Sequence, residues 1–147
     1  MIEEIIFIYS FCHDLLRELG LVDDAQCKMN AAEIMTVAFV SAIYFHGNQR
    51  CKGCVAIETL TKEVIENDFA EEVNDGKVVF HVIDFTKPEN EAIAEKYEAA
   101  WSSLFVTQHK AGKETIHDMT EFGFSYAKGE PEVFKQGLKE KIENLLK

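Results

Sequence analysis

Blocks of apolar residues alternate with amphipathic stretches along the chain, and these blocks predict alternating strands and helices. Residues 37–45 and 77–84 form two continuous runs of β-branched and aromatic side chains, a pattern typical of buried strands. Between them, residues 55–69 place apolar side chains at helical spacing among Glu and Lys. A capping box formed by Asn30 and Glu33 favours a helix from residue 31, so helix and strand compete for residues 31–45.

The second half of the chain continues this alternation. Pro88 stands where a helix begins, a position that proline tolerates, and Ala92, Ile93, Ala94, Tyr97 and Ala100 are expected to face inward. Residues 101–106 predict a third strand, 109–113 a hairpin turn and 114–119 the antiparallel partner. A final helix begins near Pro131. The predicted order is β-α-β-α-β-β-α, preceded by an amphipathic helix over residues 2–19.

Composition limits the functions that this architecture can serve. The 147 residues are 47% hydrophobic and 28% charged, which suits one domain with an appended segment. A net charge of −11 argues against a nucleic-acid surface, because phosphate binding depends on clustered Lys and Arg. The sequence has no apolar stretch long enough for a membrane span. It begins without a positively charged signal segment, and four cysteines do not make a disulfide scaffold, so we expect a cytoplasmic protein.

The most informative chemistry is a Cys-x-x-Cys motif, Cys51 and Cys54, after a polar turn and at the start of a predicted helix. The amides of a first helical turn stabilise an anion, which lowers the pKa of the first thiol. Arg50 and Lys52 flank Cys51 with positive charge and act in the same direction. We therefore predict Cys51 as the attacking thiol and Cys54 as the resolving thiol.

Half of a zinc site looks the same as this motif, so metal binding is the alternative. Zinc needs two further ligands at a matching spacing. The remaining cysteines, Cys12 and Cys27, lie in the amino-terminal segment, which has no second Cys-x-x-Cys and no His-x-x-x-His. The sequence therefore favours redox chemistry over metal binding, and we predict neither a metal ligand set nor a cofactor.

From about residue 37 to 147 the chain resembles the thioredoxin superfamily. The matching stretches are Tyr44-Phe45 before the dithiol, Val82-Ile83-Asp84, Asn90 with Ala94-x-x-Tyr97, and Leu104-Phe105-Val106. Within that superfamily, residues 44–54 and 120–127 are similar to small bacterial proteins labelled nitrophenyl-compound nitroreductase subunit, ArsF type. The resemblance implies a three-layer α/β fold, a central mixed sheet flanked by helices, with Cys51 and Cys54 at the redox positions.

The chain departs from the thioredoxin pattern at two positions. Thioredoxins keep a cis-proline facing the dithiol before the third strand, and here the corresponding residues are Ser102 and Ser103. A cis bond before serine costs about 2.5–4 kcal/mol, so a trans bond is expected. The missing proline leaves three alternatives. The site binds peptide disulfides poorly and serves one dedicated partner, or the Ser102 hydroxyl donates a hydrogen bond to the Cys51 thiolate. In the third alternative, the space left by the proline admits a metal ion on the two thiols. The second departure is at the buried acid of many thioredoxins, whose position is occupied here by Phe45. Trp101, next to Ser102, is predicted to be a core residue.

The amino-terminal segment carries a separate resemblance. Residues 1–48 resemble the helical opening region of some insertion-sequence transposases. The resemblance rests on residues 28–36, Ala42, Tyr44-Phe45 and Gly47-Asn48. The acidic catalytic region of those proteins has no counterpart downstream. We therefore predict a helical extension over residues 1–36 and a thioredoxin-like domain over 37–147.

Three functions follow as hypotheses. The first is a thiol-disulfide oxidoreductase or electron relay that exchanges electrons with a protein dithiol or disulfide, through Cys51, Cys54, Arg50, Lys52 and Ser102. The second is a thioredoxin-like module that binds zinc or copper. The third is a non-catalytic binding domain, of which a DNA-binding version is disfavoured by the acidic charge.

Overall fold

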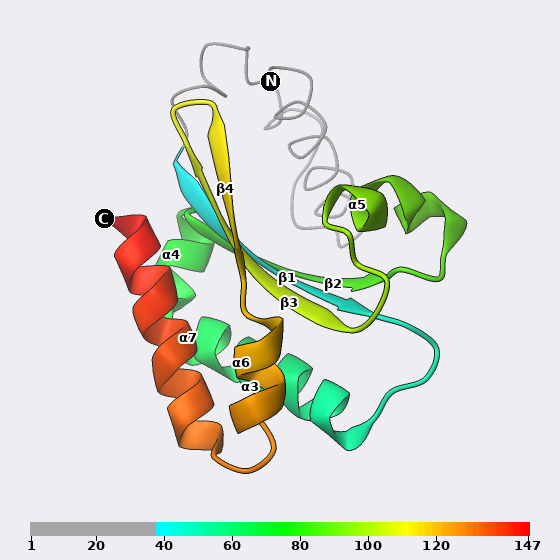
Figure 1. The fold of residues 1–147 in the computed structure, drawn as a ribbon. Coiled ribbons are helices and arrows are strands. Elements are labelled where there is room, and N and C mark those ends of the chain that lie inside the picture. The colour runs from blue at the N-terminus through cyan, green and yellow to red at the C-terminus, as the bar shows by residue number, and fades with distance from the viewer. Residues whose placement is uncertain (1–37) are drawn as a thin grey trace. The chain divides into compact units, whose positions relative to one another are not determined.

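The computed structural model describes residues 38–147 (Figure 1). The predicted extension over residues 1–36, the transposase-like stretch before residue 38, and Cys12 and Cys27 lie outside the described residues. The main compact unit comprises Phe39–Gln108 and Thr115–Lys147. In the part of the chain that is described, no helix combines the length and the apolar character needed to cross a membrane.

The elements follow the predicted order, with two helices added, one after the first long helix and one before the last. In chain order they are β1 (Phe39–His46), α3 (Lys52–Asp68), α4 (Ala70–Asn74), β2 (Val78–Asp84), a 3-10 turn η1 (Pro88–Asn90), α5 (Glu91–Lys96), β3 (Ser103–Lys110), β4 (Lys113–Asp118), α6 (Thr120–Tyr126) and α7 (Pro131–Leu146). Of the helix and the strand that the sequence allowed over residues 31–45, the structure has a strand from Phe39 onward. The added helices are α4, which follows α3, and α6, and both lie in stretches where the apolar pattern predicted no helix.

The four strands form one mixed sheet in the order β2-β1-β3-β4. Strands β1 and β2 are parallel, in a register that pairs Val40 with Val78 and His46 with Asp84. Strands β3 and β4 are joined by a two-residue turn in which Ala111 and Gly112 both have positive φ angles, 52° and 72°. Such a turn matches the right-handed twist of an antiparallel hairpin. The expectation of an α/β fold with a central mixed sheet is therefore confirmed.

The alternation of side chains along β1 divides the core between the two faces of the sheet. Val40, Ala42 and Tyr44 face the layer that α3, α6 and α7 form in Figure 1, and all three are at most 1% exposed. Their buried partners in this layer include Ile57, Val64, Phe134, Leu138 and Ile142.

The opposite face carries an aromatic cluster. The Phe45 ring lies 5.6 Å from that of Tyr97, at the end of α5, and 5.9 Å from that of Phe105 on β3. Helices therefore cover both faces of the sheet. Among the residues of the α5 region expected to face inward, Ile93 and Tyr97 are buried and Ala94 is half-buried. Ala92 is exposed within the helix, and Ala100 is exposed beyond the end of the helix at Lys96.

A glycine on α7 tests how tightly α6 is held. An added Cβ at Gly137 would stand 2.3 Å from Cζ of Phe122 on α6, whose ring also stacks on Phe134. Overpacking costs about 1–3 kcal/mol, and alanine returns at most about 1 kcal/mol of helix propensity. We expect Gly137→Ala to lower the free energy of unfolding by about 1 kcal/mol in urea titrations. Gly129→Ala, which meets open space, is the control and should change it by less than about 0.5 kcal/mol. Equal effects of the two variants would contradict this packing.

Candidate functional site

A short loop carries the chain from the end of β1 to the dithiol. The amide of Phe85 donates a hydrogen bond to the carbonyl of His46, with 3.0 Å between N and O, and so ties the ends of β1 and β2 together. Beyond it, Gly47 lies against the Phe85 ring, where an added Cβ would be 2.9 Å from Cζ. A side chain at this position would therefore require the Phe85 ring to shift. The hydroxyl of Thr86 also donates to Oδ1 of Asn48, at 3.3 Å between the two oxygens.

Cys51 is the N-cap residue of α3. Its backbone is extended, with φ −76° and ψ 166°, and its sulfur accepts a hydrogen bond from the amide of Cys54 at 3.1 Å. N-cap side chains satisfy amides of the first turn, which have no partner inside the helix. The prediction that the Cys-x-x-Cys motif opens a helix is confirmed.

The two thiols differ sharply in accessibility. Cys51 is exposed, whereas Cys54, one turn into α3, is only 5% exposed, and both are free thiols. An exposed thiol can reach the sulfur of another molecule, but a buried one can react only with its neighbour. The geometry therefore gives the two cysteines unequal access to any partner.

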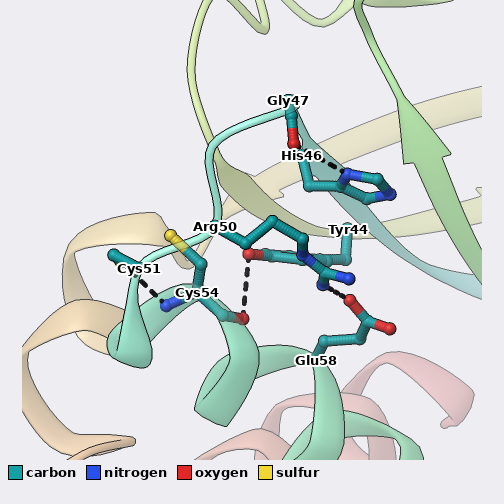
Figure 2. Close-up of polar contacts among 7 residues, drawn as sticks. All are labelled: Tyr44, His46, Gly47, Arg50, Cys51, Cys54 and Glu58. Atoms are coloured by element: carbon teal, nitrogen blue, oxygen red, sulfur yellow. Dashed lines mark hydrogen bonds and ion pairs between the residues drawn. The ribbon is translucent and has the colours of Figure 1, made fainter.

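Tyr44 of β1 lies beneath the dithiol. Its side chain is 0% exposed, and its hydroxyl donates a hydrogen bond to the Cys54 carbonyl at 3.0 Å (Figure 2). Burial, followed by the negative charge of the Cys54 thiolate, raises the pKa of Tyr44 to about 12. The phenol therefore stays protonated at physiological pH and keeps its hydrogen to donate.

Ser102 approaches the same thiol from the loop that precedes β3. Its hydroxyl acts on the Cys54 side chain and on the Tyr44 hydroxyl, and it lowers the pKa of both groups. The structure thus brings Ser102 to the dithiol, on the side of Cys54, whereas a hydrogen bond to Cys51 was one of the sequence-based alternatives. All peptide bonds in the described part of the chain are trans, as expected before Ser102.

The helix end before this loop sets its direction. The amide of Glu98 donates to the Glu95 carbonyl, and the amide of Ala99 donates to the Ala94 carbonyl, which together make a Schellman motif. Glu98 accordingly adopts a φ of 52°, a left-handed conformation that glycine usually supplies. The motif turns the chain back toward the sheet and delivers Ser102 to the thiols.

Hydrogen bonds dominate the electrostatics of the buried thiol. Burial alone raises the pKa of Cys54, but hydrogen bonds from Cys51, Ser102 and Tyr44 outweigh it and hold that pKa below its ordinary value. The buried sulfur therefore carries negative charge more readily than an ordinary cysteine does.

The two flanking cations contribute less directly than the sequence suggested. The guanidinium of Arg50 is ion-paired with Glu58 on α3, and Figure 2 shows its side chain running from the loop toward that carboxylate. The Arg50 charge acts on the Tyr44 hydroxyl, whose pKa it lowers slightly against the larger effect of burial. Lys52 is the first residue of α3 and is exposed.

Apolar side chains on the surface surround the dithiol. Trp101, next to Ser102, is 66% exposed, so the prediction that it is a core residue is wrong. Phe124 of α6 is 43% exposed and lies beside Gly53, where an added Cβ would be 3.4 Å from the ring. Val55, which follows Cys54, is 47% exposed. Within residues 38–147 there is no group of three or more His, Cys, Asp and Glu side chains that could hold a metal ion.

Comparisons with known proteins add little to this geometry. No protein-family model matches the chain, and no curated protein matches it. A solved structure described as a malarial protein is 15% identical to the chain over 56% of this chain and 82% of its own length, with a TM-score of 0.39. A likeness this weak carries no argument about fold or function.

Sequence reasoning missed two residues of the site, Tyr44 and Phe124. Tyr44 lies inside an apolar run and looks like any other core aromatic. Its position on the same strand face as Val40 and Ala42 was the available signal, because α3 with the dithiol covers that face. Phe124 belongs to α6, which was not predicted as a helix, so its position beside Gly53 left no signal in the sequence.

Removing the Tyr44 hydroxyl should change the behaviour of the protein in alkali. The folded-state pKa of about 12 exceeds the unfolded value of about 10, so the stabilising effect is complete below pH 10 and is lost as the pH rises through 12. In the reduced wild type we expect the free energy of unfolding to fall by about 2 kcal/mol over this range because of this group. Tyr44→Phe should remove that part of the decline in urea titrations. The matched control, Tyr126→Phe on α6, should retain it, and an unchanged decline in Tyr44→Phe would refute the assignment.

Proposed function

We propose that this protein is a thiol-disulfide oxidoreductase or electron relay with a thioredoxin-like fold. The observation that carries the proposal is the pairing of an exposed thiol, Cys51, at the N-cap of α3 with a buried thiol, Cys54, one turn further on. Exposure suits the first for attack on another molecule, and burial suits the second for an intramolecular step.

The arrangement of the elements supports the thioredoxin-like assignment. The dithiol follows the first of two parallel strands, the second half of the sheet is a hairpin, and a long helix, α7, closes the chain. Helices lie on both faces of the sheet (Figure 1). This agrees with the fold that the sequence resemblance implies.

The proposed reaction is a two-step exchange. The Cys51 thiolate attacks one sulfur of a partner disulfide, forming a mixed disulfide and releasing the other partner sulfur as a thiolate. The Cys54 thiolate then attacks the Cys51 sulfur, the bond from Cys51 to the partner breaks, and the second partner sulfur leaves. Both leaving thiolates take up the two protons that Cys51 and Cys54 lost. The partner disulfide is reduced by two electrons and the dithiol is oxidised to a disulfide, and the reverse sequence oxidises a partner dithiol.

The proposed partner is a protein rather than a nucleic acid. Two exposed aromatic side chains offer apolar contact area: Trp101 precedes Ser102 in the loop before β3, and Phe124 of α6 lies beside Gly53. The net charge of −11 disfavours a phosphate backbone. Arg50 and Lys52 lie in the loop and the first turn beside Cys51, where they can assist docking of an acidic segment.

Covalent trapping tests the proposal. In Cys54→Ser the mixed disulfide on Cys51 cannot be resolved, so this variant should retain a disulfide-linked partner on non-reducing gels. Cys51→Ser is the matched control: it keeps one thiol, but a buried one, and should trap nothing. Purified wild-type protein should also show one two-electron transition between about −120 and −270 mV in glutathione or dithiothreitol buffers, by alkylation and mass.

Two results would count against the proposal. One is a dithiol that forms no intramolecular disulfide at any redox poise although both thiols react with alkylating agents in denaturant. The other is a pair of thiols that stays protected until a chelator is added, which would indicate that the pair holds zinc or copper instead.

The exposed aromatic residues should affect protein partners more than small reagents. Once a protein partner has been identified by trapping, we expect Trp101→Ala to reduce the disulfide of that partner about tenfold more slowly than the wild type does. A tryptophan that anchors an interface contributes more than about 1 kcal/mol to binding. The reaction of Trp101→Ala with a small aromatic disulfide should stay within about twofold of the wild type, because that reagent needs no extended contact. Val133→Ala removes another exposed apolar side chain, on α7, and should leave both rates unchanged. If the partner disulfide and the small aromatic disulfide are slowed to a similar extent, Trp101 stabilises the loop and does not contact the partner.

A further inference from the structure

We propose that Gly53 and Phe124 form an apolar subsite beside the Cys51 sulfur, and that this subsite takes an apolar side chain that flanks the cysteine of a partner protein. This inference rests on the proposed function and deepens it, because it names the class of disulfide that the protein accepts. It assigns selectivity to an exposed ring on α6 and to the missing side chain between that ring and the sulfur.

The first argument is the space beside Gly53. A Cβ added at Gly53 would lie 3.4 Å from Cδ1 of Phe124 and 3.7 Å from the sulfur of Cys51. Both distances are ordinary van der Waals contacts, so the edge of the ring and the sulfur border the same small space. Cys51 and Phe124 are both exposed. Because Gly53 has no side chain, the space between them is left for another molecule.

The second argument is that Phe124 is held in place although its ring is exposed. At the preceding residue, an added Cβ on Gly123 would be 3.2 Å from Cδ1 of Ile57, so α6 lies close against α3 at this point. The ring of Phe122 stacks on Phe134 of α7, with 6.0 Å between the centroids. These contacts fix the backbone of α6 and leave Phe124 with 43% of its surface exposed. An aromatic side chain on a fixed backbone loses little conformational freedom when a partner binds.

The third argument is the position of the ring relative to the reacting atom. A mixed disulfide on Cys51 brings the partner cysteine within bonding distance of the sulfur. The neighbours of that cysteine are about 3.8 Å further along the partner chain, so their side chains meet the surface next to Cys51. On the side of Gly53 this surface is the edge of the Phe124 ring. An apolar neighbour buries apolar area there, whereas a polar neighbour loses water without gaining a hydrogen bond.

The charges near the subsite do not select for a charged occupant. Lys52 precedes Gly53, and Glu121 lies one turn before Phe124 on α6. Both charged side chains belong to exposed residues, and their signs are opposite. The occupant that fits is therefore an uncharged apolar side chain on an extended segment of a partner protein.

Peptide disulfides test the subsite. The probes are two short peptides of equal net charge, one with Leu and the other with Ser on both sides of a single cysteine, each as its symmetric disulfide. In a Cys54→Ser background, the Cys51 thiolate attacks one sulfur of the probe and the S–S bond of the probe breaks. One peptide leaves as a thiolate, and the other stays bound to Cys51. Mass spectrometry gives the rate of capture, and dividing it by the rate with glutathione removes the intrinsic difference between the probes.

With Gly53 and Phe124 intact, the Leu probe should be captured about tenfold faster than the Ser probe, which corresponds to about 1.4 kcal/mol. Phe124→Ala should reduce this ratio to less than about threefold and leave the rate of the Ser probe within about twofold, because only the apolar contact is lost. Phe124→Leu keeps an apolar side chain and should retain most of the preference. Ser125→Ala changes the next residue of α6, which is also exposed, and should keep the full ratio.

Gly53→Ala fills the space without strain. Its Cβ would meet the ring and the sulfur at contact distance, and alanine favours a helix more than glycine does. The variant should therefore be at least as stable as its parent in urea titrations. It should still lower the preference for the Leu probe, because its methyl group occupies the space that the flanking side chain needs. The ratio of the two rates decides this point, since a change in the reactivity of Cys51 alters both rates alike.

The outcomes separate the subsite from the proposed function. Equal normalised rates of the two probes with Phe124 intact would overturn the subsite and leave the function to the redox and trapping tests. Absence of an intramolecular disulfide at any redox poise would overturn the function even if the ratio were high. Equal slowing of both probes in Phe124→Ala would mean that the ring supports α3, and would overturn the subsite. So would a wild-type dimer in sedimentation that Phe124→Ala converts to a monomer, because a second copy of the chain would then cover the ring.

Discussion

The hydrogen bond from the Cys54 amide to the Cys51 sulfur is the contact on which the site depends. The first amides of any helix lack partners within the helix, so α3 needs an acceptor at its start, and here that acceptor is a thiol. The same bond holds Cys51 at the surface in an extended conformation and places Cys54 one turn inside. Accessibility of one thiol and protection of the other are thus two results of a single helix cap.

Adjacent residues of β1 connect this cap to both layers of the core. Tyr44 faces α3 and reaches the Cys54 carbonyl, while Phe45 faces the opposite layer and packs against Tyr97 and Phe105. A strand exposes successive side chains to opposite faces, so the position of β1 in the sheet fixes the two contacts together. A slip of one residue would exchange them and remove the hydroxyl from beneath the dithiol. The parallel register with β2, from Val40 to His46, prevents such a slip.

Sequence reasoning succeeded where one local signal decided the outcome. The helix that begins after Cys51, the strand at residues 78–84 and the helix from Pro131 all follow from periodicity and capping. For residues 31–45 the local signals competed, and the sequence did not decide between helix and strand. It failed where tertiary contacts decide. Trp101 was assigned to the core for its size, yet the chain turns at Glu98 and leaves the indole outside. Residues 120–126 carry a weak apolar pattern, and packing of Phe122 on α7 makes them a helix. Pairing of Arg50 with Glu58, two turns of α3 away, was equally invisible in the spacing of charges around Cys51.

These contacts determine which groups stabilise negative charge on the two thiols. Arg50 is engaged by Glu58, and Lys52 is exposed at the helix start, so neither cation is buried against the thiols. Charges in such positions are weakened by dissolved salt, which screens exposed groups over about 8–10 Å. Backbone amides and buried hydroxyls are not screened in this way, because water and ions do not enter the space between donor and acceptor. The Cys54 amide, which donates to the Cys51 sulfur, thus ties the affinity of the dithiol for negative charge to the fold of α3. The exposed cations are left to influence how a partner approaches, and the two tasks are carried by different residues.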